Sequence, residues 1–192
     1  EIQVLGTEHF DAVESQAEAI RETSRANRLS LPYLATAFPE MSSTDPKAWR
    51  EALQRFGRSC VLAEKLGARG IVDMAPLPPL EFPRNAAAHR YYDPAVLSTS
   101  PLKPNLDWRS YWGNVLDGYR QACDMASTHN LTFNVRPGVG TMIAGTDAFL
   151  NFHEEIARNN LRFAMDTAAQ YLVRDNLFLS MLRISDLIEV IY

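Results

Sequence analysis

The sequence lacks a basic cluster, a long apolar run and a recognisable leader. Its 19 Lys or Arg and 23 Asp or Glu residues give a formal net charge of −4. No Lys/Arg cluster is long enough to bind a phosphate backbone, so we expect no nucleic acid partner. No apolar run approaches the roughly 20 residues that span a bilayer, so we expect no membrane insertion. No signal peptide is visible, although the chain begins at Glu1 rather than Met.

Cysteine is scarce as well. Cys60 and Cys123 lie on or beside the apolar faces of predicted helices. Two buried thiols are therefore expected rather than a disulfide, which favours a cytoplasmic protein. The remaining composition, 46% hydrophobic and 22% charged over 192 residues, is that of one globular domain with its own core.

Two short stretches carry the clearest pattern. Residues 131–136 (LTFNVR) and 161–166 (LRFAMD) alternate apolar and polar side chains, which is typical of strands with two different faces. The segment between them fits a crossover helix and predicts a βαβ unit with parallel strands. Asn134, Arg136 and Asp166 would share one face, towards the carboxyl ends where α/β proteins bind ligands.

The rest of the chain also alternates strand and helix, which indicates an all-parallel α/β domain. Asp11, Asp45, Asp107 and Thr146 are expected to start helices, and Gly67 to end one. Further strands are predicted at 2–5, 29–36, 69–75 and 187–192, and helices at 11–27, 45–67, 107–130, 146–160 and 175–184.

Residues 77–106 interrupt the alternation. This segment is rich in proline and contains His89, Tyr91 and Tyr92. A loop of this length is usually functional or disordered, and its place after a strand makes it a candidate lid. His89 would then bind substrate, with a solvated loop histidine as the alternative.

Two architectures fit this order of elements. About six strands are predicted, whereas a (β/α)8 barrel of about 250 residues has eight, so length alone favours an open doubly wound sheet. The chain begins at a strand and ends within one, which instead suggests a barrel that continues beyond it.

Four segments resemble the sugar phosphate isomerase/epimerase family, also called xylose-isomerase-like barrels. The helix and strand at 45–72 contain AEKLGA, similar to the family's A-x-x-L-G-A, and LTFNVRPG resembles L-x-L-E-N-H-P-G. LRFAMDTAAQ resembles x-G-L-x-L-D-T-G-H, and SDLIEVIY resembles the start of D-R-I-x-H-V-H-x-K-D. The resemblance implies a single (β/α)8 TIM-barrel domain over residues 1–192. Its first and eighth strands would lie outside this chain, and two open sheet edges would favour a homo-oligomer.

The resemblance also implies a site. Family members hold one divalent metal (Mn, Mg, Co or Zn) with carboxylates and a histidine, and two acidic residues move protons. The ligand glutamate falls on Asn134, the ligand aspartate on Asp166 and the ligand histidine on Tyr192, while two further histidines fall on Arg136 and Ala169. Only Asp166 keeps its family residue, so a weak or absent metal site is expected.

We therefore expect catalytic roles for Asp166, Asn134 and Tyr192. Arg136 would repel a metal but suit a substrate carboxylate or phosphate, and it joins His89 as a substrate-binding residue. Two other charged residues are expected to be structural: Arg162 as an ion-pair partner at the barrel base, and Glu189 facing the helices.

The implied function is that of a sugar phosphate isomerase or epimerase, with a lyase as a variant. It would act on a small polyhydroxy or keto substrate by enolisation. The alternative is a non-catalytic or metal-independent barrel that binds a small anionic ligand or a partner subunit. A DNA-repair endonuclease of the same fold would need three metals and many histidines, and four histidines with a net charge of −4 argue against it.

Overall fold

A computed structural model describes residues 1–4, 6–83 and 87–192. In this part of the chain, six parallel strands form one sheet in sequence order. A strictly sequential order is that of an α/β barrel and excludes a doubly wound sheet, whose order reverses. The sheet is thus part of a barrel. Its strands are β1 (Ile2–Gln3), β2 (Tyr33–Ala35), β3 (Gly70–Met74), β4 (Thr132–Arg136), β5 (Leu161–Met165) and β6 (Ile188–Ile191).

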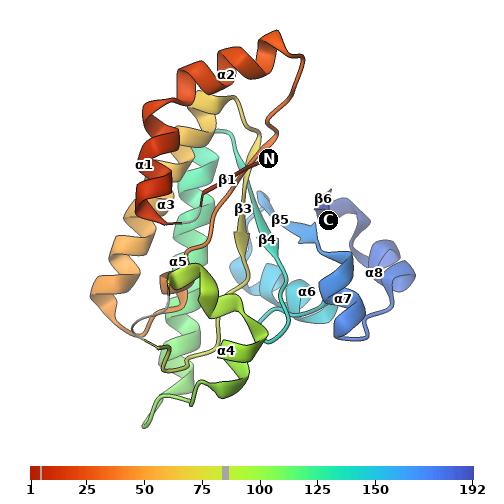
Figure 1. The fold of residues 1–192 in the computed structure, drawn as a ribbon. Coiled ribbons are helices and arrows are strands. Elements are labelled where there is room, and N and C mark those ends of the chain that lie inside the picture. Colours follow the sequence, from red (N-terminus) through yellow and green to blue (C-terminus); the bar gives the residue numbers. More distant parts are fainter. Residues whose placement is uncertain (5, 84–86) are drawn as a thin grey trace.

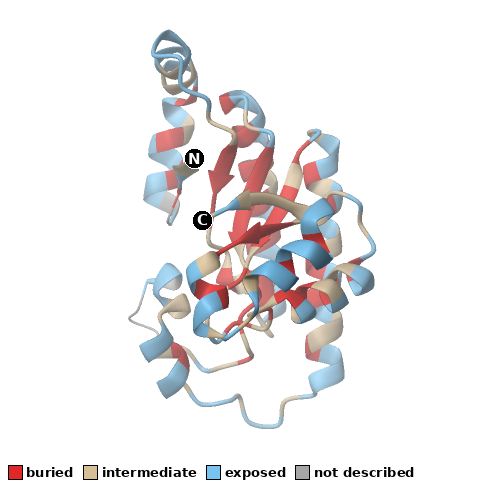
Figure 2. Ribbon diagram, turned by 90° about the vertical axis from the view of Figure 1, so that its right-hand side faces the viewer, coloured by how far each residue is buried: buried red, intermediate tan, exposed pale blue. Residues whose placement is uncertain are grey.

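Helices cover the outer face of this sheet, and the long helices α3 and α5 lie side by side (Figure 1). Buried residues follow the strands and the inward sides of these helices (Figure 2). The α-helices on this face are α1 (Thr7–Ser15), α2 (Ala17–Ala26), α3 (Pro46–Leu66), α5 (Trp108–Thr128), α6 (Thr146–Ile156), α7 (Thr167–Leu172) and α8 (Leu177–Ile184).

The main core lies between the sheet and these helices. Phe133 is fully buried at its centre, with ring centroids 4.8 Å from Phe56 of α3 and 5.6 Å from Tyr119 of α5. Aromatic side chains of this size supply much of the burial that stabilises such a core. A smaller cluster on the opposite, inner face of the sheet contains Tyr33, Ala35, Val72 and Ala164, with Val190 and Tyr192 packed against it.

The predicted ends of the two longest helices are confirmed. Asp45 and Asp107 each cap a helix, accepting hydrogen bonds from the backbone of Lys47 (2.9 Å) and Arg109 (3.1 Å). Gly67 ends α3 in the left-handed conformation, with φ of 78°. Glycine adopts this conformation without the steric cost that a Cβ brings.

Two other predicted helix starts are wrong. The first helix begins at Thr7 behind Gly6 and is interrupted at Gln16, so Asp11 lies inside it and pairs with Arg58 at 3.0 Å. Thr146 is the first residue of α6 and not its cap. Its backbone N–H instead donates to the Asp175 carboxylate at 2.8 Å, which satisfies the helix end from a distant residue.

Other predicted boundaries also differ. The strand expected over 29–36 starts only after Pro32, because proline cannot donate within a sheet ladder. The helix expected over 175–184 starts at Leu177, and a further helix, α7, precedes it. Of the strand expected over 2–5, Leu5 lies outside the described residues.

The proline-rich segment has its own secondary structure. It contains the short helices η2 (Ala88–Tyr92) and α4 (Pro94–Thr99) and an antiparallel bridge between Leu80 and Leu102. The expected long loop over 77–106 is therefore partly ordered, with 84–86 outside the described residues. Two more 3₁₀ helices, η1 (Pro39–Ser42) and η3 (Ser185–Leu187), join other elements.

The cysteine prediction is confirmed: Cys60 and Cys123 are free and buried. Burial raises the pKa of both thiols to about 12, so neither is a ready nucleophile. Over the described residues, no helix is both long and apolar enough to cross a membrane.

Candidate active site

Three of the predicted site residues meet at the carboxyl ends of β4, β5 and β6. Arg136 is the last residue of β4, while Asp166 and Tyr192 directly follow β5 and β6. Nε and Nη2 of Arg136 donate to Oδ2 of Asp166 at 3.0 and 2.7 Å. The Arg136 guanidinium carbon also lies 4.0 Å from the centre of the Tyr192 ring. Neighbouring parallel strands bring these side chains together, which the alternation predicted for Arg136 and Asp166 and the family resemblance implied for Tyr192.

Asp166 is held from two sides. Its Oδ1 accepts the backbone N–H of Ala169 at 2.9 Å, which caps α7, while its Oδ2 accepts from Arg136. The residue is 9% exposed. Both carboxylate oxygens are therefore engaged, and the capped helix end fixes the carboxylate that orients Arg136.

Tyr192 completes the arrangement. Its carbonyl accepts from the backbone N–H and hydroxyl of Thr167 at 3.2 and 2.7 Å, which ties β6 to the start of α7. Its hydroxyl donates to the Glu1 carboxylate. Burial, and then Glu1, raise the pKa of Tyr192 above its ordinary value. The phenol therefore stays protonated and supports the guanidinium with its ring face.

Arg136 keeps one nitrogen for a ligand. Within the described part of the chain its Nη1 makes no hydrogen bond, and 30% of its side chain is exposed. A guanidinium that is fixed through two nitrogens and open at the third is a preorganised donor for carbonyl, hydroxyl or carboxylate oxygens.

Asn134 does not join this group. It is fully buried two residues before Arg136, and its Nδ2 donates to the carbonyl of Ile71 (3.1 Å) and to the hydroxyl of Thr132 (3.0 Å). A Cβ on Gly70 would lie 2.9 Å from that Nδ2, so this glycine makes room for the amide. The side chain points away from the carboxyl end, in a structural position.

His89 is not brought to the site either. It lies on η2 with an exposed side chain, and the contacts of Arg136 described above involve Asp166 and Tyr192 alone. Its predicted substrate-binding role remains a prediction that depends on movement of the proline-rich segment.

Comparison with known proteins agrees with the fold. The family model described as xylose isomerase-like TIM barrel matches residues 1–191. The chain belongs to the xylose isomerase-like TIM barrel family. A search of curated protein sequences finds no significant match.

Several solved structures share the fold of this xylose isomerase-like chain. A 3-keto-D-glucoside 4-epimerase from E. coli superposes with a TM-score of 0.73 at 13% identity, covering 94% of this chain and 64% of the epimerase. An L-ribulose 3-epimerase gives 0.71 at 13% identity, with coverage of 91% and 54%. A probable 3-DHS dehydratase from Bacillus anthracis gives 0.69 at 11% identity, with coverage of 92% and 55%. The chain thus spans between half and two thirds of their length.

The family's divalent metal does not fit the residues described here. Outside 84–86 and residue 5, no group of three or more His, Cys, Asp or Glu side chains is placed to hold a metal ion. Both oxygens of Asp166 already accept hydrogen bonds, one of them from a cation. A fixed guanidinium beside the only matching ligand opposes a second cation, so no chemical step is assigned to a metal.

The sequence analysis missed one notable residue, Asp73 of β3. It is 1% exposed on the helix-facing side of the sheet, where its Oδ1 accepts the backbone N–H of Phe38 at 3.1 Å. Its Oδ2 has no hydrogen-bond partner among the described residues. Burial raises the pKa of Asp73 to about 7, and burial together with the Asp73 carboxylate raises that of half-buried Tyr92. The only sequence signal was an acid inside the apolar run GIVDM.

The predicted roles at the base of the barrel need correction. Ile188 pairs with Phe163 and Val190 with Ala164, so a bulge leaves Glu189 as an extra residue. Glu189 therefore does not face the helices: its carboxylate accepts from the Tyr33 hydroxyl at 3.3 Å and lies 3.7 Å from Arg69. Arg162 donates to the carbonyls of Asn159 and Leu161 instead of pairing with an acid.

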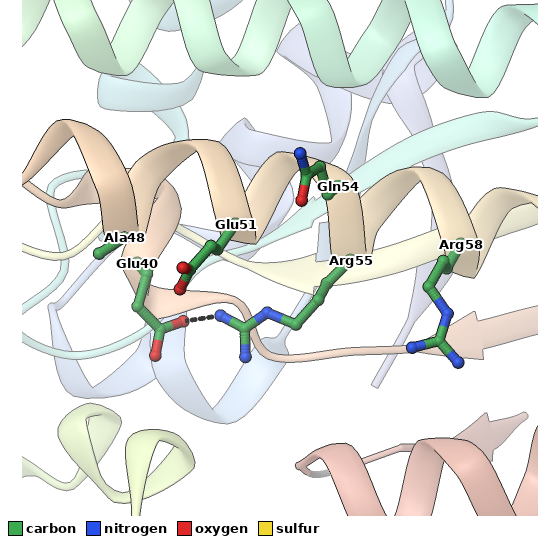
Figure 3. Close-up of a pocket in the computed structure, with 6 residues that line it drawn as sticks. All are labelled: Glu40, Ala48, Glu51, Gln54, Arg55 and Arg58. Carbon is green, nitrogen blue, oxygen red and sulfur yellow. Dashed lines mark hydrogen bonds and ion pairs between the residues drawn. The ribbon is translucent and has the colours of Figure 1, made fainter.

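A separate groove of about 550 Å³ runs along α3, away from Arg136. Arg55 donates to Glu40 at 2.9 Å within the groove (Figure 3). Arg58 instead pairs with Asp11 and Glu14, which do not line the groove. Most of its charged side chains are thus engaged in ion pairs on an exposed helix face, and the groove is not taken as the site. Its lining residues are Glu40, Ala48, Glu51, Gln54, Arg55 and Arg58.

Proposed function

We propose that the protein is an isomerase- or epimerase-like enzyme that moves a proton at a carbon next to a carbonyl in a small polyhydroxy or keto substrate. The observation that carries this proposal is the Arg136–Asp166 pair, fixed at the carboxyl ends of adjacent strands with Nη1 of Arg136 open. In α/β barrels this is the end at which substrates bind. The epimerases that share the fold support the reaction class.

Each residue has a distinct task in this scheme. Nη1 of Arg136 donates to the substrate carbonyl and stabilises the negative charge that develops on this oxygen when the neighbouring carbon loses its proton. Tyr192 supports the plane of the guanidinium. Asp166 positions Arg136 through Oδ2, which accepts both guanidinium hydrogen bonds, whereas Oδ1 accepts a single hydrogen bond from Ala169 and keeps a free lone pair. That lone pair is the candidate acceptor for the proton, which the carboxyl group then returns to a carbon of the enolate to complete the isomerisation.

The charge of the site favours an uncharged substrate. The Arg136 cation is offset by the Asp166 carboxylate at 2.7 Å, and the Glu1 carboxylate lies beside Tyr192. A phosphate or carboxylate would meet both carboxylates as well as the guanidinium, and like charges at short range repel. This revises the expectation, drawn from Arg136 alone, that the site would suit an anion.

Solvent exchange tests this proposal directly. The native protein is incubated in D₂O with unphosphorylated ketopentoses and ketohexoses and, in parallel, with their phosphates. Proton NMR then follows deuterium uptake at the carbon next to the carbonyl. We expect uptake with at least one uncharged ketose and less with its phosphate. Uptake with phosphates alone would contradict the proposed substrate charge, and no uptake with any ketose would contradict the proposed activity.

A second candidate function is a metal-independent barrel that binds a small anion without turning it over. The open Nη1 of Arg136 is the one feature that supports it, because a guanidinium can bind a carboxylate or phosphate with no metal, whereas the carboxylates of Asp166 and Glu1 oppose it. Inorganic phosphate and citrate are the probes. A rise in melting temperature that Arg136→Ala abolishes, together with no deuterium uptake, would favour binding over catalysis.

A further inference from the structure

The segment between β3 and α5, here called the strap (residues 76–107, described apart from 84–86), starts beyond the carboxyl end of β3 and leads to the first turn of α5. Its two ends are joined at a neck, where Leu80 bridges Leu102. Two backbone hydrogen bonds flank this bridge, from Glu81 to Pro101 (2.9 Å) and from Lys103 to Pro79 (3.1 Å). The neck is therefore a short two-stranded ribbon.

The neck is anchored to the body of the protein. Nζ of Lys103 donates to the Thr44 hydroxyl at 2.6 Å, and the Ser42 hydroxyl accepts the backbone N–H of Leu77 at 3.0 Å. Contacts between η2 and η1 add a further attachment, and within the strap the Tyr91 ring of η2 stacks on Phe82 with centroids 4.5 Å apart. The base of the strap thus has several independent attachments.

The helix α4 is attached differently. Among the strap side chains described between 87 and 102, Leu97 alone is buried. A Cβ on Gly140 would lie 3.1 Å from Cδ1 of Leu97, so the leucine rests directly on this glycine, whose φ is +84°. Leu97 is thus the one buried side chain of α4, and it packs on the rest of the molecule at Gly140.

That contact lies close to the candidate active site along the chain. Gly140 belongs to the turn 137–140 that follows Arg136, and α4 lies beside the loop leaving β4 (Figure 1). Movement of α4 away from Gly140 would therefore uncover the turn that carries the chain away from Arg136.

We propose that α4 is a lid that opens and closes over the Arg136 site, with the neck as its hinge and the Leu97–Gly140 contact as its latch. A segment held by one buried side chain opens at much lower free energy than the core does. Closure over bound substrate would exclude water and retain the reacting molecule. What the lid encloses rests on the proposed function, whereas its motion does not.

Hydrogen exchange tests the motion without a ligand. The reporter amides for the lid are Leu97 in α4 and Ser100 directly after it, which donate to Asp93 and Val96. Those for the neck are Glu81 and Lys103. We expect the α4 amides to exchange at least about tenfold faster than the neck amides, as a locally opening unit does. Equal protection of α4, neck and core would overturn the lid.

Leu97→Ala provides the mutational test, with Val96→Ala as the matched control. Both remove aliphatic side-chain volume from α4, but Val96 is only half-buried and Leu97 makes the latch contact. Leu97→Ala should speed α4 exchange on the order of tenfold while the neck and global unfolding change little. An equal effect of the two variants on α4 exchange would contradict the latch.

Steady-state kinetics on a ketose that exchanges deuterium then connects the lid to the site. Leu97→Ala should raise KM with a smaller change in kcat. A lid that opens more often lets bound substrate escape before it reacts, while the residues that react with the substrate stay in place. If the α4 amides exchange fast but no ketose is turned over, the proposed lid motion is supported and the proposed function is contradicted. If Leu97→Ala turns the ketose over with an unchanged KM, the proposed lid is contradicted and the proposed function is supported.

Discussion

Arg136 donates two hydrogen bonds to a single oxygen of Asp166, while the other oxygen of Asp166 caps α7. One carboxylate therefore joins the end of β4, the end of β5 and the first turn of a helix. Its substitution affects two separable properties: the charge that orients Arg136 and the cap that stabilises α7.

Asp166→Asn and Asp166→Ala should separate these properties. Asparagine can still accept the Ala169 N–H and cap α7, but it removes the negative charge beside Arg136, and alanine removes both. We expect Asp166→Ala to unfold at about 1 kcal/mol lower free energy than Asp166→Asn. Urea denaturation at pH 7 measures the difference, and equal stability of the two variants would show that the cap contributes nothing.

The buried carboxyl of Asp73 should make stability depend on pH. Its pKa is raised to about 7 in the folded protein, so the folded chain keeps a proton that the unfolded chain releases above about pH 4. The free energy of unfolding should therefore fall as pH rises through this window, by up to about 1.4 kcal/mol per pH unit, and then level off.

Asp73→Asn isolates that effect, because every other titrating group is common to both proteins. The difference in unfolding free energy between Asp73→Asn and the unaltered protein should grow in favour of the variant from pH 5 to pH 8. Urea midpoints at several pH values provide the measurement. A difference that stays constant with pH would mean that Asp73 is ionised in both states.

Two phenylalanines should respond very differently to truncation. Phe133 is fully buried between Phe56 and Tyr119, whereas Phe178 of α8 is 83% exposed. Phe133→Ala should cost about 3–5 kcal/mol, because it opens a cavity in the main core. Phe178→Ala should stay within about 0.5 kcal/mol. Denaturant unfolding of both variants measures the two changes in unfolding free energy. A loss for Phe133→Ala as small as that for Phe178→Ala would contradict a main core centred on Phe133.

Much of the fold could be read from the sequence. Asp45-Pro46 and Gly67 bracket α3 because capping and left-handed backbone are local properties of those residues. Arg136 and Asp166 could be brought together because alternation assigns the face and parallel pairing assigns the end, whereas Tyr192 was added by the family resemblance. Their catalytic roles remain predictions, since position alone carries no chemistry.

The remainder depends on contacts that no local pattern encodes. The bulge at Glu189 shifts the pairing of β6 by one residue and reverses the expected direction of its side chain. Asn134 has the expected face, but the space left by Gly70 of the neighbouring strand decides that its amide turns away from the site. Asp73 reads as an ordinary strand residue, yet in the fold it is buried and accepts a hydrogen bond from the backbone of Phe38, which is distant in sequence.

The central claim is that Arg136 polarises a substrate carbonyl, and its most direct measurement is deuterium uptake by Arg136 variants. Arg136→Ala should lower the rate of uptake on the most reactive ketose by about 100-fold or more, as loss of a preorganised donor to a developing oxyanion does. Arg162→Ala, which removes an arginine from the start of β5, away from the carboxyl end, should leave the rate nearly unchanged. Uptake that survives Arg136→Ala, with the protein folded, would contradict the account.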